Sequence, residues 1–501
     1  MGQGASNSMI SFIVPIYKPN LEVLEKSIKS LAVQALKDWE AIFVLDGPCP
    51  EAEIVIRRAI KKCPNNYKIM VIEHGGAPRA RNKGAEMAQG DVYCFWDSDC
   101  VIEPGTSKLW YDTFAKSPEV GFVYSGYKFF GDSMAIDSEP WDAWQLRVRN
   151  FISTCFPVRR EIYPGWCEDL ESLQDWDFWL SVVEKAEKAG WDIKRIGKYY
   201  RGYAFSTPFP TPDSISGKGC TPEKWLERMD AVKKRHGIEQ NAICVSSLQY
   251  KADGVLLAKN IGADFQIDPS DKPNHYKTII QVGFSLSPNH VERHAAIFQR
   301  KDIKKVLFWT GDNINEIYNS VCFKAVDAYS NLLNDSVTQY VEDLEAKRLM
   351  ERAGFKVQVR PIPLVNTDNI VPMPEKVKFA IDVAADYGQV FGIIERSLPD
   401  VELEVVDGVH SINDYTGLIH FYPDKTLSHM IKRAILSGRH VISNVKQPYC
   451  GYISDKESQW DFILGVVEKV RDIIDKKDTD PKALEHYKET LNPEKLKEAI
   501  A

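Results

Sequence analysis

Residues 92–99 read Val-Tyr-Cys-Phe-Trp-Asp-Ser-Asp, an apolar run that stops at two acidic residues. An unbroken apolar run of this length is typical of a strand that is buried on both faces of a parallel sheet. Asp97 and Asp99 follow where the chain leaves this strand, with Ser98 between them. We therefore predict a buried strand over 92–96 whose carboxyl end presents two carboxylates to one space.

The segments before this strand alternate between strand and helix patterns. Short apolar runs occupy 11–16, 41–45 and 67–72, and apolar residues recur at helical spacing over 21–36 and 80–88. Such alternation predicts an α/β fold with a mostly parallel sheet flanked by helices. Ligands of these folds bind at the carboxyl ends of the strands, which is where Asp97 and Asp99 lie.

The 501 residues are enough for two or three domains. We predict a first domain over 1–210, a helical connecting region over 211–276 with helices at 222–236 and 242–260, a second αβ unit over 277–475 and a helical tail over 476–501. The second unit is inferred from strand patterns at 278–284, 305–309, 355–359, 377–383, 401–406, 418–422 and 440–443.

The composition is that of a globular protein, with 44% hydrophobic and 27% charged residues. The formal net charge of -7 argues against a broad surface for nucleic acid. The cysteines are scattered singly without a CxxC pair, which favours reduced thiols and a cytoplasmic location over disulfides or structural zinc. No apolar run approaches the roughly 18–20 residues of a transmembrane helix.

Paired carboxylates at a strand end suit a hard divalent cation, Mn²⁺ or Mg²⁺. Such ions prefer oxygen ligands and commonly bridge to phosphate groups. The alternative is an acidic turn, because Asp and Ser are favoured in turns for their own backbone hydrogen bonds. The surrounding segments favour the metal site.

Three further segments precede the paired aspartates in order. They are Pro15-Ile16-Tyr17 after the first strand, Leu45-Asp46-Gly47 after the second, and the Gly-rich stretch 75–84, which contains Arg81-Asn82. In this order the chain resembles the family 2 glycosyltransferases of the GT-A fold over roughly residues 10–206. The resemblance implies that Asp97 and Asp99 hold the metal and that a nucleotide-sugar donor is bound by Pro15, Tyr17, Asp46, Arg81, Asp97 and Ser98.

The stretch 174–180, Gln-Asp-Trp-Asp-Phe-Trp-Leu, resembles the acceptor side of that family. The resemblance implies that Asp175 is the general base of an inverting transfer, with Asp177 as the rival candidate. The structural alternative is a helix cap at Asp175 and a first-turn carboxylate at Asp177. Because sugars stack on indole rings, Trp166 and Trp176 are predicted to contact the acceptor, although large aromatic residues are more often core residues.

Two positions depart from the pattern of this family. Gln174 stands where a glutamate usually precedes the base, so a neighbouring carboxylate that would raise the pKa of the base is missing. Tyr203 stands where many members have a histidine near the metal, and a phenol does not replace a neutral imidazole as a ligand. Either water and donor phosphate alone complete the metal shell, as Mg²⁺ tolerates, or this loop has another task.

The stretches 304–312, 349–364 and 416–445 together resemble, more loosely, a shortened GT-B glycosyltransferase with Rossmann-like sheets. Arg433 falls where that class has the glutamate that holds the donor ribose, and a guanidinium cannot accept hydrogen bonds. The resemblance implies a degenerate unit that binds acceptor glycan, positions the first domain or mediates assembly, homo-oligomers included.

Together these inferences predict an inverting, metal-dependent glycosyltransferase that moves a sugar from a nucleotide diphosphate donor, a UDP-sugar first, to a hydroxyl of a glycan or glycoconjugate. Two alternatives stay open: a bifunctional transferase with a second active unit, and a non-catalytic glycan-binding or scaffold protein. A sugar-nucleotide pyrophosphorylase is disfavoured, because Tyr17-Lys18-Pro19 is not the Gly-rich phosphate loop that it needs after the first strand.

Overall fold

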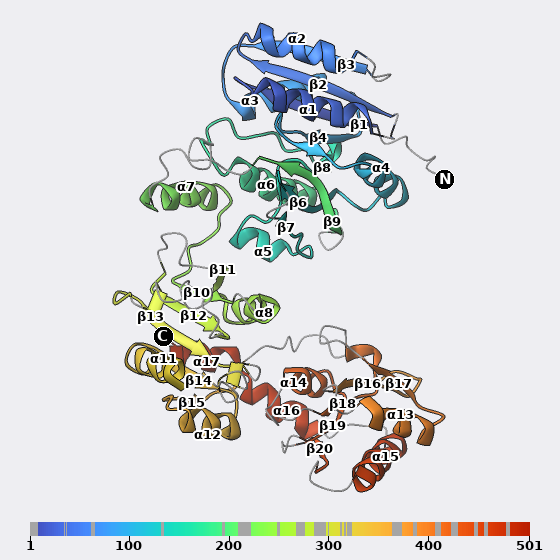
Figure 1. Ribbon diagram of the computed structural model, residues 1–501, viewed down its shortest axis with the longest axis vertical. Coiled ribbons are helices and arrows are strands. Elements are labelled where there is room, and N and C mark those ends of the chain that lie inside the picture. Colours follow the sequence, from blue (N-terminus) through green and yellow to red (C-terminus); the bar gives the residue numbers. More distant parts are fainter. Residues whose placement is uncertain are drawn as a thin grey trace. The chain divides into compact units, whose positions relative to one another are not determined.

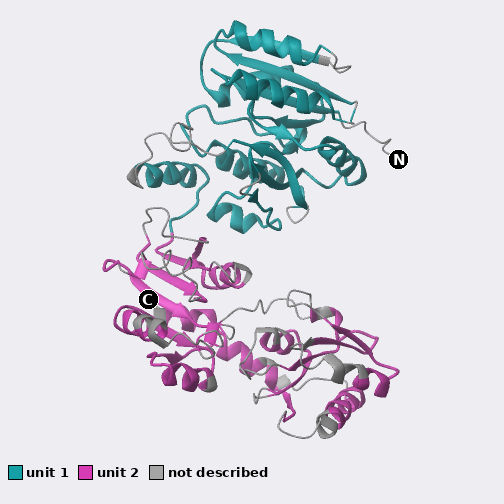
Figure 2. Cartoon of the chain, viewed as in Figure 1, with its two compact units in different colours: residues 1–240 teal, residues 241–501 magenta. Residues whose placement is uncertain are grey.

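The computed structural model divides the chain into two compact units, residues 1–240 (unit 1) and residues 241–501 (unit 2), as Figure 2 shows. Both units consist of sheets and helices, so the predicted α/β class is confirmed. The structure describes residues 9–34, 36, 38–61, 66–131, 135–192, 196–208, 222–247, 251–266, 276–284, 297–298, 300–310, 313–314, 317, 323–362, 373–383, 388–405, 412–421, 429–444, 449–454, 459–476 and 481–500.

The first half of unit 1 is a parallel block of strands with connecting helices (Figure 1). In chain order its elements are β1 (Ile10–Ile16), α1 (Leu21–Ala32), β2 (Trp39–Asp46), α2 (Pro50–Ala59), β3 (Asn66–Ile72), α3 (Ala77–Met87) and β4 (Val92–Phe95). β1 lies between β2 and β4, and β3 pairs with the other side of β2. The strands and helices predicted up to residue 96 are therefore confirmed in their order, and α2 is a further helix that was not predicted.

A glycine lets α3 pack closely on this block. A Cβ atom at Gly84 would lie 2.4 Å from the Cγ2 atom of Ile13 in β1 and 3.1 Å from that of Val44 in β2. No larger side chain fits in this space without displacing the helix. Because α3 also carries Arg81 and Asn82, its close packing fixes the position of both side chains.

The second half of unit 1 adds strands in both directions. Its elements are β5 (Val101–Ile102), α4 (Thr106–Lys116), β6 (Phe122–Phe129), β7 (Ala135–Ile136), α5 (Ala143–Val148), β8 (Pro157–Arg159), α6 (Gln174–Lys188), β9 (Gly197–Thr207) and α7 (Pro222–Arg235). β8 runs antiparallel between β4 and β6, and β9 pairs in parallel with β6 and antiparallel with β5. The prediction of a mostly parallel sheet holds only up to β4, because no long crossover helix precedes β8.

Unit 2 contains two sheets whose described strands are all parallel. Both sheets repeat one strand order, β11-β10-β12-β13-β14-β15 in the first and β17-β16-β18-β19-β20 in the second. The strands of the first sheet are β10 (Ile243–Ser246), β11 (Asp264–Gln266), β12 (Thr278–Val282), β13 (Lys304–Phe308), β14 (Thr338–Val341) and β15 (Gln358–Val359), and those of the second are β16 (Lys378–Val383), β17 (Glu402–Val405), β18 (Gly417–Phe421), β19 (His440–Ser443) and β20 (Gly451–Tyr452).

The boundaries of the units differ from the predicted ones. Where a single helix over 242–260 was expected, the buried strand β10 precedes α8 (Lys251–Ile261), so the first sheet of unit 2 starts within the predicted connecting region. Helix α7 of that region belongs to unit 1. The predicted tail is part of unit 2, because α16 (Pro481–Thr490) packs on α14 (His429–Leu436) and α17 (Pro493–Ile500) packs on α8.

Within the described residues, the structure contains no helix with the length and apolar character needed to span a bilayer.

Candidate active site

Asp97 and Asp99 follow β4 at the carboxyl end of the parallel block. The backbone N–H of Trp96 still donates to the carbonyl oxygen of Ile13 at 2.8 Å, and the chain turns away after it. The Asp97 side chain is 33% exposed, Asp99 reaches solvent, and Ser98 is half-buried between them. Partial desolvation and the charge of Asp97 raise the pKa of Asp99 to about 6. Mutually repelling carboxylates at a strand end are a fitting pair of donors for a hard divalent cation.

Arg81 of α3 links this acidic turn to the start of α6. Its Nη2 atom donates to Asp97 Oδ1 at 2.8 Å, and its Nη1 atom lies 3.4 Å from Gln174 Oε1. The guanidinium carbon lies 4.4 Å from the centre of the Trp166 ring. The Nε atom is buried and has no hydrogen-bond partner among the described residues. A buried cation with an unused donor beside two carboxylates fits an anionic ligand such as a diphosphate.

Asp46 ends β2 and is buried, with 2% of its side chain exposed. Its Oδ1 atom accepts from the backbone N–H of Gly75 at 2.8 Å, and its Oδ2 atom accepts from that of Gly76 at 2.9 Å. The Nδ1 atom of His74 lies 2.9 Å from Oδ2. Asp46 thereby holds the loop before α3, and its contact with a nucleobase stays a prediction.

Tyr17 and His74 form an exposed aromatic pair beside Asp46. Their ring centres are 4.2 Å apart and the ring planes differ by 10°. Tyr17 is 49% exposed and the His74 side chain is 54% exposed. Pro15 lies two residues before Tyr17, half-buried in β1. The pair offers an accessible face on which a planar base can stack.

Asp175 lies in the first turn of α6 and is half-buried. Asn150 Nδ2 donates to its Oδ2 atom at 2.8 Å, and the backbone N–H of Trp176 lies 3.0 Å from its Oδ1 atom. Burial raises the pKa of Asp175, and the hydrogen bonds that its carboxylate accepts from backbone N–H groups, followed by the positive charge of Arg81, oppose this increase only in part. The negative charge of Asp97 acts in the same direction as burial. A carboxylate with a raised pKa beside these groups is suited to accept a proton.

Asp177 has a structural role, which corrects its prediction as a rival base. Its side chain is 2% exposed, and its Oδ1 atom lies 2.8 Å from Arg235 Nε and 2.9 Å from His236 Nε2. The other ring nitrogen of His236 lies 2.6 Å from Glu184 Oε1. Burial lowers the pKa of His236, but the hydrogen bonds with Asp177 and Glu184 outweigh it and the net shift is upward. These contacts bind the end of α7 to α6.

Trp166 and Trp176 were predicted to contact the acceptor, but the structure places both in the core. Trp166 is 4% exposed and stacks on Phe178, with ring centres 4.2 Å apart and planes 6° apart. Trp176 is 2% exposed, and its indole N–H donates to the Leu146 carbonyl oxygen at 2.6 Å. Neither ring presents a face to solvent. Packing in this aromatic cluster removes the large apolar area of each indole from water, which favours the buried position.

Asn82 fixes the loop that contains Trp166. Its Oδ1 atom accepts from the Tyr163 hydroxyl at 2.7 Å and from the Trp166 backbone N–H at 2.8 Å. Its Nδ2 atom donates to the Trp166 carbonyl oxygen at 3.0 Å and to Glu168 Oε1 at 2.8 Å. The adjacent residues Arg81 and Asn82 thus have different roles. Arg81 contacts the acidic turn, and Asn82 holds the loop that contains Trp166.

Tyr203 of β9 is bound away from the paired aspartates. Its hydroxyl donates to Asp137 Oδ1 at 3.0 Å, and Lys128 Nζ lies 5.1 Å from the centre of its ring. The phenol therefore joins β9 to the chain after β7. Tyr203, which stands where a histidine was expected, adds no ligand to the metal site proposed at Asp97 and Asp99.

Sequence reasoning missed two polar residues of the site, Asn150 and His74. Asn150 reaches Asp175 across 25 positions of the chain, and no motif surrounds it. His74 directly precedes the Gly-rich stretch, and that position was the one available signal. Both contacts exist because the fold brings separate segments together.

Comparison with known proteins agrees with the predicted resemblance. Residues 11–163 match the family model "Glycosyl transferase family 2", a range that includes Asp46, Arg81, Asp97 and Asp99 but ends before Asp175. Two of the relatives that are similar to this chain are as follows. "Uncharacterized protein y4gI" of Sinorhizobium fredii is 24% identical over 188 residues, which are 36% of this chain and 21% of that protein. "Putative teichuronic acid biosynthesis glycosyltransferase TuaG" of Bacillus subtilis is 25% identical over 189 residues, which are 35% of this chain and 73% of that protein.

A search of solved structures finds S. aureus TarS, residues 1–349, in complex with UDP-GlcNAc. It shares 18% sequence identity with a TM-score of 0.35, over 45% of this chain and 66% of that one. The match with protein y4gI spans about a fifth of the length of that relative. The family match lies on the part of unit 1 that holds the acidic turn and Arg81. Residues 11–163 therefore match glycosyltransferase family 2, the family that the order of the motifs in the sequence resembles.

Proposed function

We propose that unit 1 is the catalytic domain of an inverting glycosyltransferase, which moves a sugar from a nucleotide diphosphate donor, a UDP-sugar first, to a hydroxyl of a glycan or glycoconjugate. One observation carries this proposal: Arg81 joins Asp97, at the end of β4, to the first turn of α6, where Asp175 lies. Three elements thus bring an acidic turn, a buried cation and a candidate base to one place. The family match over 11–163 supports the same class.

In this proposal the donor lies along the carboxyl end of β1, β2 and β4. The base stacks on the exposed pair of Tyr17 and His74. Asp97 and Asp99 would hold Mn²⁺ or Mg²⁺, which would supply positive charge beside the diphosphate of the donor. Arg81, with its unused Nε donor, stabilises charge on the same group.

Asp175 takes the proton from the acceptor hydroxyl while the hydroxyl oxygen forms a bond to the anomeric carbon and the bond from that carbon to the diphosphate breaks. A single displacement of this kind inverts the anomeric configuration and needs one carboxylate only. Retention through two displacements would need a second carboxylate as nucleophile. Asp177 does not supply it, because Arg235 and His236 hold it in the core.

We further propose that unit 2 is a GT-B-type unit without donor binding of its own, which holds acceptor glycan or positions unit 1. Its two parallel sheets with one strand order support the GT-B type. Arg433 in α14 supports the loss of donor binding, because the ribose needs an acceptor there. The side chain of Arg433 lies outside the described residues.

The donor site is tested by calorimetric titration of UDP into the full chain with Mn²⁺ and with a chelator. We expect binding that requires Mn²⁺ and is lost in Asp97→Asn. Asp112→Asn is the matched control, because Asp112 pairs with Lys108 in α4 and should leave UDP binding unchanged. Equal binding with chelator would contradict the metal proposal, and absence of UDP binding would favour the scaffold alternative.

A further inference from the structure

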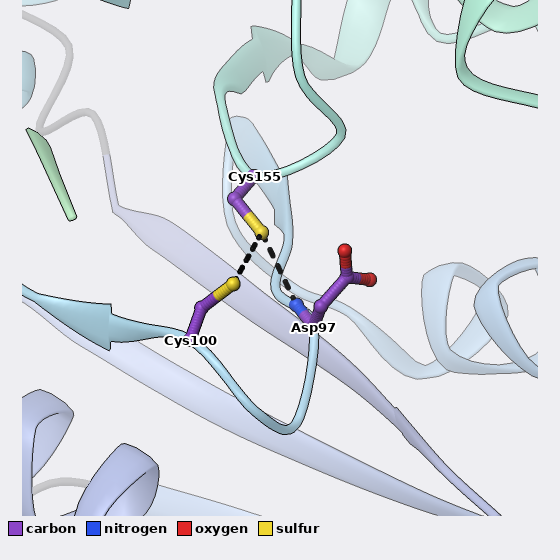
Figure 3. Close-up of side chains that lie close together, drawn as sticks. All are labelled: Asp97, Cys100 and Cys155. Atoms are coloured by element: carbon purple, nitrogen blue, oxygen red, sulfur yellow. Dashed lines mark hydrogen bonds between the residues drawn. The ribbon is translucent and has the colours of Figure 1, made fainter. Parts of the chain in front are cut away.

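Three buried cysteines lie directly beneath the acidic turn. Cys94 is in β4, Cys100 follows Asp99, and Cys155 comes from the loop before β8. The sulfur atoms of Cys100 and Cys155 are 3.6 Å apart, and the Cys155 sulfur accepts from the Asp97 backbone N–H at 3.3 Å. Figure 3 shows both thiols directed toward each other beside Asp97. One ligand atom from each of Asp97, Cys100 and Cys155 lies within 4.8 Å of the other two.

The spacing of the two sulfurs matches that of two ligands on one tetrahedral ion. With Zn–S bonds of about 2.3 Å, tetrahedral geometry places two sulfur ligands about 3.8 Å apart. The distance of 3.6 Å between Cys100 and Cys155 is close to this value. A carboxylate oxygen on the same ion would lie about 3.5 Å from each sulfur. A ligand oxygen of Asp97 lies within 4.8 Å of both sulfurs, and Figure 3 shows its carboxylate directed away from them, so binding of an ion requires the Asp97 side chain to turn toward the thiols.

Ligand chemistry separates this cluster from the hard-cation pair above it. Thiolates select borderline and soft ions such as Zn²⁺, whereas Mg²⁺ and Mn²⁺ favour carboxylate, carbonyl and water. Both thiols are buried, with Cys100 at 3% and Cys155 at 0% exposure, whereas the Asp97 side chain is partly exposed. Asp97 belongs to both donor sets, so occupation of one draws its carboxylate away from the other.

We propose that Cys100, Cys155 and Asp97 form a binding site for a thiophilic divalent cation such as Zn²⁺, with water or Asp99 as the fourth ligand. Asp99 Oδ1 lies 3.8 Å from the Cys100 sulfur, which places it within reach. On binding, each thiol releases its proton to solvent and each sulfur forms a bond to the ion. Because Asp97 leaves Arg81 and the hard cation, Zn²⁺ bound here antagonises Mg²⁺ or Mn²⁺ at the acidic turn.

The test is a titration of the full chain with Co²⁺ in a thiol-free reductant, followed by absorption spectroscopy. Co²⁺ takes the place of Zn²⁺ and gives a thiolate-to-cobalt charge-transfer band when cysteine sulfur is bound. We expect the band to saturate at one equivalent, to disappear when Zn²⁺ is added and to persist in excess Mg²⁺. The absence of a thiolate band in the wild-type chain would overturn the proposal, whether or not the chain binds UDP.

Matched variants assign the band to these residues. Cys100→Ser and Cys155→Ser should each remove it, and Asp97→Asn should weaken Co²⁺ binding. Cys94→Ser is the control, because Cys94 is equally buried and its sulfur contacts the Cys155 carbonyl oxygen at 3.5 Å, yet it lies outside the cluster. A band that survives in the Cys100→Ser/Cys155→Ser double variant, or one that Cys94→Ser also removes, contradicts the assignment.

Discussion

Asp175→Asn and Asp177→Asn make the same chemical change two residues apart and should have opposite consequences. If Asp175 is the general base, its loss lowers kcat by about 10²–10⁴-fold, the usual contribution of a positioned base, which is roughly 3–5 kcal/mol in the activation barrier. Its fold should persist, because an asparagine side chain can still accept the Trp176 N–H that lies 3.0 Å from the carboxylate.

Asp177→Asn should instead destabilise unit 1. Asp177 and His236 each have 2% side-chain exposure, and removal of one partner from a buried ion pair costs about 3 kcal/mol of the free energy of unfolding. Arg235 contributes less, because half of its side chain is exposed. Turnover per folded molecule should stay within a few-fold of the wild type.

Both variants are measured by kcat at saturating donor and by urea unfolding of the same preparations. The result that refutes this reasoning is the reverse pattern. If Asp177→Asn loses turnover with unchanged unfolding while Asp175→Asn retains it, the proton acceptor has been assigned to the wrong carboxylate.

Substitutions at Asn150, His236 and Trp166 test other contacts of unit 1. Asn150→Ala removes the donor that stabilises the charged Asp175 carboxylate, so the pKa of Asp175 should rise further. The acidic limb of the kcat/KM profile should then move to higher pH, and an unmoved limb would show that Asp175 is not the base. The pKa of His236 in the folded chain is raised above its ordinary value of 6.5. The contribution of His236 to stability is therefore complete below pH 6.5 and is lost as the pH rises through the folded pKa. Thermal unfolding should show this loss in the wild type and not in His236→Gln. Trp166→Ala should lower the free energy of unfolding by about 3–5 kcal/mol, and unchanged unfolding with weaker acceptor binding would instead restore its predicted acceptor contact.

The fold of the first hundred residues was predictable because local patterns determine it. The unbroken apolar run over 92–96 and the alternation before it need no long-range information. The short buried run of β10 was mistaken for helix, since a brief apolar segment fits either structure when only its period is considered. The antiparallel direction of β8 was not predictable, because it depends on the path of the preceding loops, and no local sequence pattern determines that path.

The site was predictable as a list of residues but not as an arrangement. Asp175 and Asp177 differ by about 200° around a helix, so one must face away from the site, and the sequence does not say which. The contacts of Asp177 with Arg235 and His236 join segments 58 and 59 positions apart, which only the fold brings together. Trp166 and Trp176 lie in the core for the same reason, because their burial depends on neighbours from several elements.

The catalytic activity of unit 1 is tested by a screen for hydrolysis of nucleotide sugars, with the full chain in Mn²⁺ or Mg²⁺ and in chelator. We expect release of UDP from at least one UDP-sugar that requires the metal and is abolished in Asp97→Asn, with Asp112→Asn behaving as the wild type. Failure to hydrolyse any nucleotide sugar, with or without metal, would contradict a catalytic unit 1.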